Sequence, residues 1–328
     1  MMMGKIKIFT LHPLKKIKRI IFNLVKRSIK KNTYYVLSGL AKLFIYTKIG
    51  REVFYEETPE NQLLLTKTNE NLYYIVNSSD KEIGKSIYSH KESFDAQHLI
   101  EALNLIPYRK SILLDVGANI GTIGILGMSK SYFDKCIAFE PDPNNFELLK
   151  YNVLLNGLDN RFELRNEALS DKGNCSLELE LSKDNYGDHR VRVQPTSDRY
   201  KEGDRKVISV AVNTLDAVLS NENLDEYVLF MDTQGFEGHV LSGAKKLIKN
   251  NIPIITEFWP YGLRRTDGLN LFYDVLSSSA YTSMWDLRNP SKKLKFSINE
   301  LKKIAAELGE DGAHTDLVFI NEKIDRQK

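Results

Sequence analysis

Short apolar runs alternate with amphipathic stretches through the middle of this chain. Continuous apolar runs are typical of strands buried on both faces of a sheet, and apolar residues that recur every three or four positions are typical of helices. The first half of the pattern predicts strands at 112–116, 136–140 and 161–165, with helices from 122 and over 143–156. Because strands alternate with helices, we expect an α/β fold with a mainly parallel, doubly wound sheet.

The same alternation returns towards the C-terminus. It predicts strands at 207–212, 227–232, 252–258, 282–287 and 315–321, and helices at 235–250, 269–277 and 298–308. Between the two halves, residues 170–206 are polar and irregular, and they predict a loop region with at most an edge strand at 191–193.

The N-terminal third has a different pattern. Two apolar segments, 62–66 and 72–76, flank a polar turn and predict a small β hairpin, and a helix begins near Ser93. With 328 residues, of which 42% are hydrophobic, the chain can bury one large core and carry a small extension. We therefore expect a helical arm over 1–60, a hairpin and lead-in helix over 61–106, and the main domain over 107–328.

Charge separates the arm from the body. The first acidic residue is Glu52, and 13 Lys and Arg residues precede it. Because the whole chain carries +3, residues 52–328 together carry a formal charge of −10. The arm is therefore basic and the body acidic.

Within the arm, apolar residues repeat with helical spacing between Leu14 and Val25, and basic residues take the other positions. Such a helix suits peripheral binding to an anionic membrane, or it packs its apolar face on the body; both remain open. The apolar stretch 20–25 is shorter than the roughly 7–15-residue core of a signal peptide. No uninterrupted apolar run approaches the roughly 20 residues of a membrane-spanning helix.

The two cysteines, Cys136 and Cys175, form no Cys-x-x-Cys motif and no disulfide framework. This usage suits a reducing compartment. We therefore expect a cytoplasmic protein, at most peripheral at the inner face of the membrane.

The strongest chemical signal lies around the first two strands of the main domain. The strand at 112–116 contains Asp115 and leads into Gly117 and Gly121, and the next strand ends on Glu140. A strand, a glycine turn, a helix and a second strand ending on an acid let the backbone approach a nucleotide closely and offer a carboxylate to its ribose. The unit predicts a nucleoside-bearing cofactor.

Glycine spacing distinguishes between such cofactors. Dinucleotide folds use Gly-x-Gly-x-x-Gly, in which the second glycine makes room for a pyrophosphate. Here Asn119 takes that position, with Ala118 before it, so the turn suits a ligand without phosphate. S-adenosylmethionine is such a ligand. After the third strand, Glu167 and Ala168 lie where an adenine is expected, although plain exposure explains Glu167 equally well.

Several motifs resemble those of the FkbM-type methyltransferases. They recur in order over residues 112–257: Asp-Val-Gly-Ala-Asn-Ile-Gly at 115–121, Phe-Glu-Pro-Asp-Pro at 139–143, Asn-x-x-Leu-Asn-Gly at 152–157, Ala-Leu-Ser-Asp at 168–171, Asn-Thr-Leu-Asp at 213–216 and Met-Asp-Thr-Gln-Gly-Phe-Glu at 231–237. The resemblance implies a class I, Rossmann-like methyltransferase fold that uses S-adenosylmethionine, often on sugar hydroxyls in polyketide or surface-glycan biosynthesis. It adds Pro141 to the expected cofactor site. Many relatives carry Asp-Val-Glu-Gly where this chain has the neutral Gln234.

The acceptor side needs a group that removes a proton from a hydroxyl. Asp232 and Glu257 end the next two strands, and ligands in such sheets bind beyond the carboxyl ends of the strands. Either acid suits a general base or a ligand of a divalent cation. Two carboxylates without a histidine-rich set make a poor transition-metal site, so the sequence predicts no metal. Glu237, at the start of a helix, suits a helix cap.

The polar loop contains Asp188, His189 and Arg190, which suit substrate binding, with His189 as a further candidate base. A surface turn is the alternative explanation. Trp259 and Tyr261 suit a sugar-stacking wall, or they belong to the core.

The favoured function is O-methylation of a sugar hydroxyl in a glycan or glycosylated metabolite. An RNA methyltransferase is an alternative, but the body is acidic and the arm lacks aromatic stacking residues, so we expect no nucleic-acid partner. A third possibility is a membrane-associated scaffold that binds cofactor without activity. An NAD-dependent oxidoreductase ranks last because of the glycine spacing.

Overall fold

The computed structural model describes residues 44–107, 111–193, 202–220, 223–310 and 312–323. The chain forms two compact units, Met1–Glu57 and Thr58–Lys328. In the first unit, the described residues include helix α3 (Lys48–Glu57). The predicted amphipathic helix at 14–25 lies outside the described residues, so the expected membrane contact stays a prediction. Among the residues described, every helix is too short or too polar to cross a bilayer.

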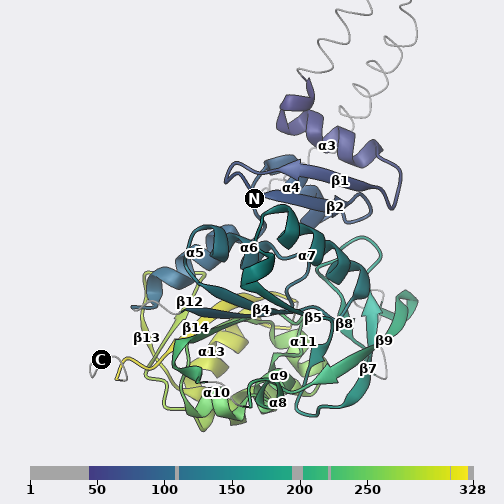
Figure 1. Ribbon diagram of the computed structural model, residues 1–328. Helices are drawn as coiled ribbons and strands as arrows, with labels where there is room; N and C mark the ends of the chain where they lie inside the picture. The colour runs from purple at the N-terminus through teal and green to yellow at the C-terminus, as the bar shows by residue number, and fades with distance from the viewer. Residues whose placement is uncertain (1–43, 108–110, 194–201, 221–222, 311, 324–328) are drawn as a thin grey trace, which may run out of the picture. The chain divides into compact units, whose positions relative to one another are not determined.

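The second unit is built on a mixed sheet of eight strands (Figure 1). From one edge to the other, the strands are β13 (Leu294–Lys295), β12 (Ser283–Asp286), β14 (Thr315–Ile320), β11 (Ile254–Phe258), β10 (Tyr227–Met231), β3 (Ile112–Val116), β4 (Lys135–Phe139) and β5 (Phe162–Arg165). The strands from β11 to β5 are parallel, and β14, β12 and β13 pair antiparallel at the other edge. Counted along the chain, the parallel strands lie in the order 3-2-1-4-5 of a doubly wound nucleotide-binding fold. The predicted α/β sheet is therefore confirmed.

The central strands are apolar because both of their faces are covered. All five residues of β10 and of β11 are buried. Figure 1 shows α5 (Ala96–Leu105), α6 (Thr122–Ser129) and α7 (Pro143–Leu155) on one face of the sheet. The other face carries α8 (Leu215–Val218), α9 (Glu237–Ser242), α10 (Lys245–Lys249), α11 (Pro260–Arg265) and α13 (Ile298–Leu308). Helix α12 (Gly268–Ser277) packs against α9.

The polar region between the two halves is not the irregular loop that the sequence predicts. It contributes β7 (Cys175–Leu181) and β8 (Arg190–Val191) to a second sheet. The other strands of this sheet are β6 (Ala168–Leu169) and β9 (Lys206–Asn213), and the order is β6-β9-β7-β8. Strand β9 confirms the strand predicted at 207–212. Strand β7 pairs antiparallel with β9 along its whole length, from Cys175 opposite Val212 to Leu181 opposite Lys206. The sequence of β7 alternates apolar and polar residues, so a search for period-two alternation would have found this strand.

The prediction of one continuous helix over 235–250 is also wrong, because the structure has two shorter helices there. Gly243 and Ala244 separate α9 from α10. A Cβ on Gly243 would lie 2.0 Å from the Ser170 carbonyl oxygen, so this close approach requires glycine. The Asp216 carboxylate then accepts from the N–H groups of Lys245 and Lys246 and starts the second helix.

The hairpin β1 (Leu63–Lys67) and β2 (Tyr73–Asn77) confirms the predicted turn, and α4 (Ile83–His90) follows it. Asn152 of α7 and Asn156, which caps the end of this helix, hold the hairpin. The Ile75 N–H donates to Asn152 Oδ1 over 2.6 Å, and the Tyr73 N–H donates to Asn156 Oδ1 over 2.9 Å. Asn152 Nδ2 also donates to the Ile120 carbonyl over 3.0 Å, so this buried side chain joins the hairpin to the turn before α6.

Candidate active site

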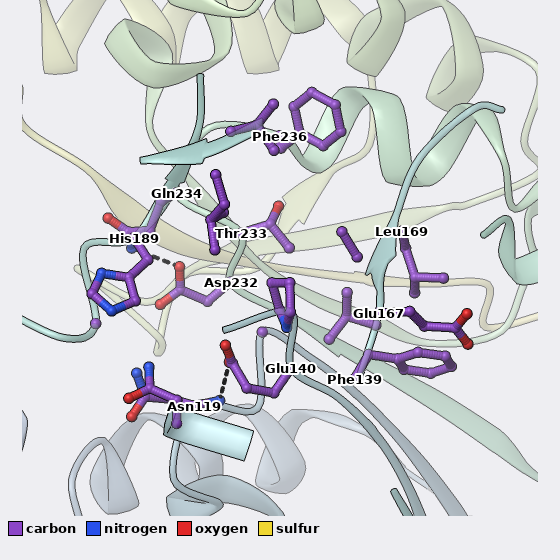
Figure 2. A pocket seen from close by; sticks show the side chains of 18 of the residues that line it. Asn119, Phe139, Glu140, Glu167, Leu169, His189, Asp232, Thr233, Gln234 and Phe236 are labelled. Carbon is purple, nitrogen blue, oxygen red and sulfur yellow. Dashed lines mark hydrogen bonds between the residues drawn. The ribbon is translucent and has the colours of Figure 1, made fainter. Parts of the chain in front are cut away.

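A pocket lies at the carboxyl ends of β3, β4 and β10, where the strand order of the large sheet reverses. It encloses about 600 Å³, part of which is open to solvent, and the second sheet closes one wall. Figure 2 shows Phe139, Glu167 and Leu169 on one side and His189 and Gln234 on the other.

The turn at 117–121 leaves none of its five backbone N–H groups free. Gly117 and Ala118 donate to the Phe139 carbonyl over 3.0 and 2.9 Å, and Asn119 donates to Glu140 Oε2 over 2.8 Å. Ile120 donates to the Asn119 side chain, and Gly121 donates to the Ala118 carbonyl. A pyrophosphate bound at such a turn needs free amide donors. This turn offers none.

The first glycine of the turn is required by the protein itself. Gly117 has φ of +86°, and a Cβ there would lie 1.8 Å from the Asp232 carbonyl oxygen. The close approach brings the end of β10 against the turn after β3. It therefore places Asp232 on the wall of the same pocket as Asn119.

Glu140 lines the pocket and is 5% exposed. Its Oε2 accepts from Asn119, and its Oε1 accepts from the Asp142 N–H over 2.7 Å. Burial, followed by the neighbouring Asp142 carboxylate, raises the pKa of Glu140 to about 8. A carboxylate has about four acceptor positions, so about two remain for a ligand.

Asp115 occupies a different place from the one that the sequence suggests. It is buried beneath the turn, and its Oδ2 accepts from the Gly124 N–H over 3.1 Å. Burial raises its pKa to about 7, with a smaller effect of the Asp232 charge. Asp115, Ala118 and Gly121 are absent from the pocket wall, whereas Gly117, Asn119, Glu140, Pro141, Glu167 and Ala168 line it.

The Glu167 end of the pocket is joined to the Glu140 end through one side chain. Asn166 Nδ2 donates to the carbonyls of Glu140 and Pro141 over 2.8 and 3.1 Å. Glu167 Oε1 accepts from Arg165 over 3.3 Å, which turns this carboxylate towards the end of β5. Ala168 and Leu169, at the start of the second sheet, form an apolar part of the wall.

Sequence reasoning missed the role of Tyr186. Its carbonyl accepts from Asn119 Nδ2 over 2.9 Å and from Asn145 Nδ2 over 3.0 Å, so two amides hold this loop over the pocket. Its N–H donates to Asp80 over 3.3 Å. The partners are up to 106 residues away in the chain, and no local pattern reveals them.

His189 lines the pocket, but both of its ring nitrogens face partners. Nδ1 accepts from the Ser182 N–H over 3.0 Å, which places the proton of the neutral ring on Nε2. Nε2 lies 3.7 Å from Asp142 Oδ2. Burial is the main cause of the lowered pKa of His189, so the neutral ring is favoured near pH 7.

Asp188, Arg190 and Trp259 lie outside this pocket. The Asp188 carboxylate accepts from Arg190 Nε and, over 2.6 Å, from Arg205. The guanidinium of Arg190 lies 4.5 Å from the centre of the Trp259 ring, and both residues are buried. The structure therefore buries Arg190 and Trp259 against each other, whereas Asp188 is half-buried and lines a neighbouring cavity together with Tyr186 and His189.

The acceptor side of the pocket carries an acidic cluster. Asp232 and Glu257 lie close to one another, and Gln234 Nε2 donates to both, over 2.7 and 3.4 Å. Burial and then the Asp232 charge raise the pKa of Glu257 well above its usual value, and burial likewise raises the pKa of Asp232. Asp232 lines the pocket, whereas Glu257 lies behind it.

The structure defines the class of protein to which this chain belongs, a class I, Rossmann-like methyltransferase fold with its pocket at the point where the strand order reverses. The profile of the Methyltransferase FkbM domain matches residues 115–278. The chain belongs to the FkbM methyltransferase family, as its motifs suggested.

Solved structures with similarity to this chain include three methyltransferase-fold proteins. The methyltransferase FkbM from Methylobacillus flagellatus KT is 16% identical, with a TM-score of 0.39 over 94% of this chain and 60% of that chain. The TYW2 protein of P. horikoshii, solved with MeSAdo, is 14% identical, with a TM-score of 0.40 over 85% and 83% of the two chains. The tRNA m1G37 methyltransferase of M. jannaschii is 10% identical, with a TM-score of 0.36 over 80% and 56%. No curated protein sequence matches the chain significantly.

Proposed function

We propose that the protein is an S-adenosylmethionine-dependent methyltransferase that acts on a hydroxyl of a sugar, in a glycan or a glycosylated metabolite. One observation supports the cofactor above all others. The turn at 117–121 uses all of its amide donors internally, yet it presents the Glu140 carboxylate to the pocket. That combination suits a ribose without a neighbouring pyrophosphate.

The pocket also suits the rest of the cofactor. Its wall combines apolar side chains at Phe139, Ala168 and Leu169 with a few polar groups, which is typical of small-molecule sites. We assign the ribose to Glu140, the adenine to the wall at Phe139, Ala168 and Leu169, and the methionine end to the Gly117 side. When bound, S-adenosylmethionine supplies a methyl group that its sulfonium already activates.

The protein then has to orient the acceptor and take its proton. We assign proton removal to Asp232, which lines the pocket, with Glu257 behind it as the partner that shares its charge. His189 is a poorer base, because Nδ1 already accepts a hydrogen bond and Nε2 faces Asp142. We assign it to positioning of the loop.

A second cavity supports a hydroxylated acceptor. It encloses about 1,910 Å³ of partly open space, and Tyr186 and His189 line both this cavity and the first. Its other side chains are mostly amides, hydroxyls and charged groups, including Asn61, Asn77 and Asn144. Such groups match the many hydroxyls of a glycan. The formal charge of −10 on residues 52–328 opposes binding of an RNA backbone.

Calorimetry on the full chain tests the cofactor assignment. We expect S-adenosylmethionine and S-adenosylhomocysteine to bind with one site per chain, and NAD to bind at least a hundredfold more weakly. Tight binding of NAD alone would overturn the assignment. Transfer of labelled methyl to a panel of glycans and to tRNA then distinguishes the two acceptor classes, and exclusive labelling of tRNA would refute the sugar proposal.

A further inference from the structure

Three carboxylates from three different elements meet beside the pocket. Asp232 follows β10, Glu237 begins α9 and Glu257 lies in β11. One oxygen from each lies within 4.8 Å of the other two. In the part of the chain that the structure describes, no lysine or arginine forms an ion pair with any of them.

A role as helix cap, which the sequence suggests for Glu237, does not account for both oxygens of its carboxylate. Its Oε1 accepts from the Thr233 N–H, the Thr233 hydroxyl and the Gly235 N–H, over 2.8, 2.9 and 3.2 Å. Its Oε2 is fully buried and has no hydrogen-bond partner among the described residues. Three donors hold the carboxylate in place, and a buried acceptor without a partner is costly, so the free oxygen points to a ligand.

The surroundings add negative charge. Asp316 lies opposite Glu257 in the pairing of β11 with β14, and Asp95 also contributes to this acidic region. The basic side chain that faces these outer acids is His98, with Nδ1 3.0 Å from Asp316 and 3.9 Å from Asp95. One histidine does not balance five carboxyl groups.

We propose that Asp232, Glu237 and Glu257 bind a hard divalent cation, of the Mg²⁺, Mn²⁺ or Ca²⁺ class. Carboxylate oxygens are the ligands that these ions prefer. Oxygens on opposite sides of one ion lie about 4.0–5.2 Å apart, twice the metal–oxygen distances of about 2.0–2.6 Å. The three oxygens lie within 4.8 Å of one another, so none of their separations exceeds the upper limit of that range.

Gln234 completes the site. In this structure its amide nitrogen donates to Asp232 and Glu257 and so supplies the positive end of a dipole where the cation would lie. Rotation of the amide turns its oxygen to the ion as a further ligand. The role of the cation rests on the proposed function: because Asp232 lines the pocket, the ion would stabilise negative charge on an acceptor hydroxyl.

The test measures binding of Mn²⁺ to the full chain by the paramagnetic resonance signal of the free ion, with Ca²⁺ and Mg²⁺ as competitors. We expect one site per chain that both competitors empty. Glu237→Gln keeps an oxygen for the three donors and should weaken Mn²⁺ binding at least tenfold. Gln234→Glu adds a carboxylate at the same place and should strengthen it at least tenfold.

Glu140→Gln is the matched control, because Glu140 is a buried acid of the same pocket that lies outside the cluster. It should retain the Mn²⁺ site and lose cofactor affinity, whereas Glu237→Gln should do the reverse. Failure of the cofactor assignment therefore leaves the Mn²⁺ result intact. The cation site would be refuted if the wild-type chain bound no Mn²⁺ at a one-to-one ratio. It would also be refuted if a folded Gln234→Glu variant bound Mn²⁺ no more tightly than the wild type.

Discussion

Replacement of Glu140 by glutamine tests the cofactor pocket most directly. The carboxylate accepts from the N–H groups of Asn119 and Asp142, one on each oxygen, and has about two acceptor positions left for ribose hydroxyls. Glutamine keeps the shape but replaces one oxygen by a donor. That NH₂ group faces either a backbone N–H or a ribose hydroxyl, so at least one hydrogen bond to a charged acceptor is lost.

The expected loss follows from the energy of such bonds. A hydrogen bond to a charged group contributes about 1.5–3 kcal/mol. The dissociation constant of S-adenosylmethionine should therefore rise about 10- to 150-fold, at 1.4 kcal/mol per tenfold change. Calorimetry above pH 8, where the Glu140 carboxylate is ionised, measures this constant, and circular dichroism shows whether the variant is folded. A folded Glu140→Gln protein whose affinity stays within threefold of the wild type would refute the ribose assignment.

The raised pKa of Glu140 gives the same variant a pH signature. Ribose hydroxyls donate to the ionised carboxylate, so affinity should increase with pH, by at most about tenfold per unit, and level off above about 8. Stability of the free protein should change in the opposite sense. A carboxyl group with a raised pKa favours folding in its neutral form, so its contribution is full below about 4.5 and lost as pH rises through about 8. Glu140→Gln should flatten the pH dependence of both cofactor affinity and stability. If the slopes of these pH profiles stayed unchanged in the variant, Glu140 would not be the group that causes them.

Three further changes test other parts of the structure. Gly117→Ala should lower the free energy of unfolding by more than the roughly 1–3 kcal/mol of a strained φ, because its Cβ would clash with the Asp232 carbonyl. Gly157→Ala is the control in chemical denaturation, because Gly157 has a positive φ but open space around it. Equal losses of stability in the two variants would contradict the close approach. Asp232→Asn should lower kcat about 10²- to 10⁴-fold without changing cofactor affinity, whereas His189→Gln should mainly raise the KM for the acceptor. If His189→Gln instead lowered kcat and Asp232→Asn mainly raised the KM, His189 would be the base. Deletion of residues 1–32 should reduce binding to phosphatidylserine vesicles and leave cofactor affinity intact, and undiminished vesicle binding would exclude the arm as a membrane anchor.

The sequence was sufficient for the large sheet because its signals are local. Continuous apolar runs predicted β3 and β10 within a residue, and the pattern of α13 predicted both of its ends. Each of these elements is buried on the faces that its own sequence marks as apolar. The family motifs around 115–121 and 231–237 are likewise local, and the FkbM match confirms them.

Local signals were less informative where another segment decides the conformation. The break at Gly243 depends on the Ser170 carbonyl, which lies 73 positions earlier in the chain. The second sheet depends on the pairing of β7 with β9, which lie in separate parts of the chain, so the period-two pattern of β7 does not by itself identify its partner. Arg190 and Trp259, two residues of the predicted substrate group, are buried against each other for the same reason, since they come from distant parts of the sequence.

By itself, the sequence determined the order of the parallel strands along the chain, the glycine turn after β3 and the acid at the end of β4, because burial periodicity and turn chemistry act over a few residues. Only the tertiary structure decided which polar groups share one site. It placed Asp115 beneath the turn, brought the Tyr186 loop over the pocket and set Glu237 beside Asp232 and Glu257. These contacts join segments that are distant in the chain, and a carboxyl group in isolation carries no information about the neighbours that the fold will bring to it.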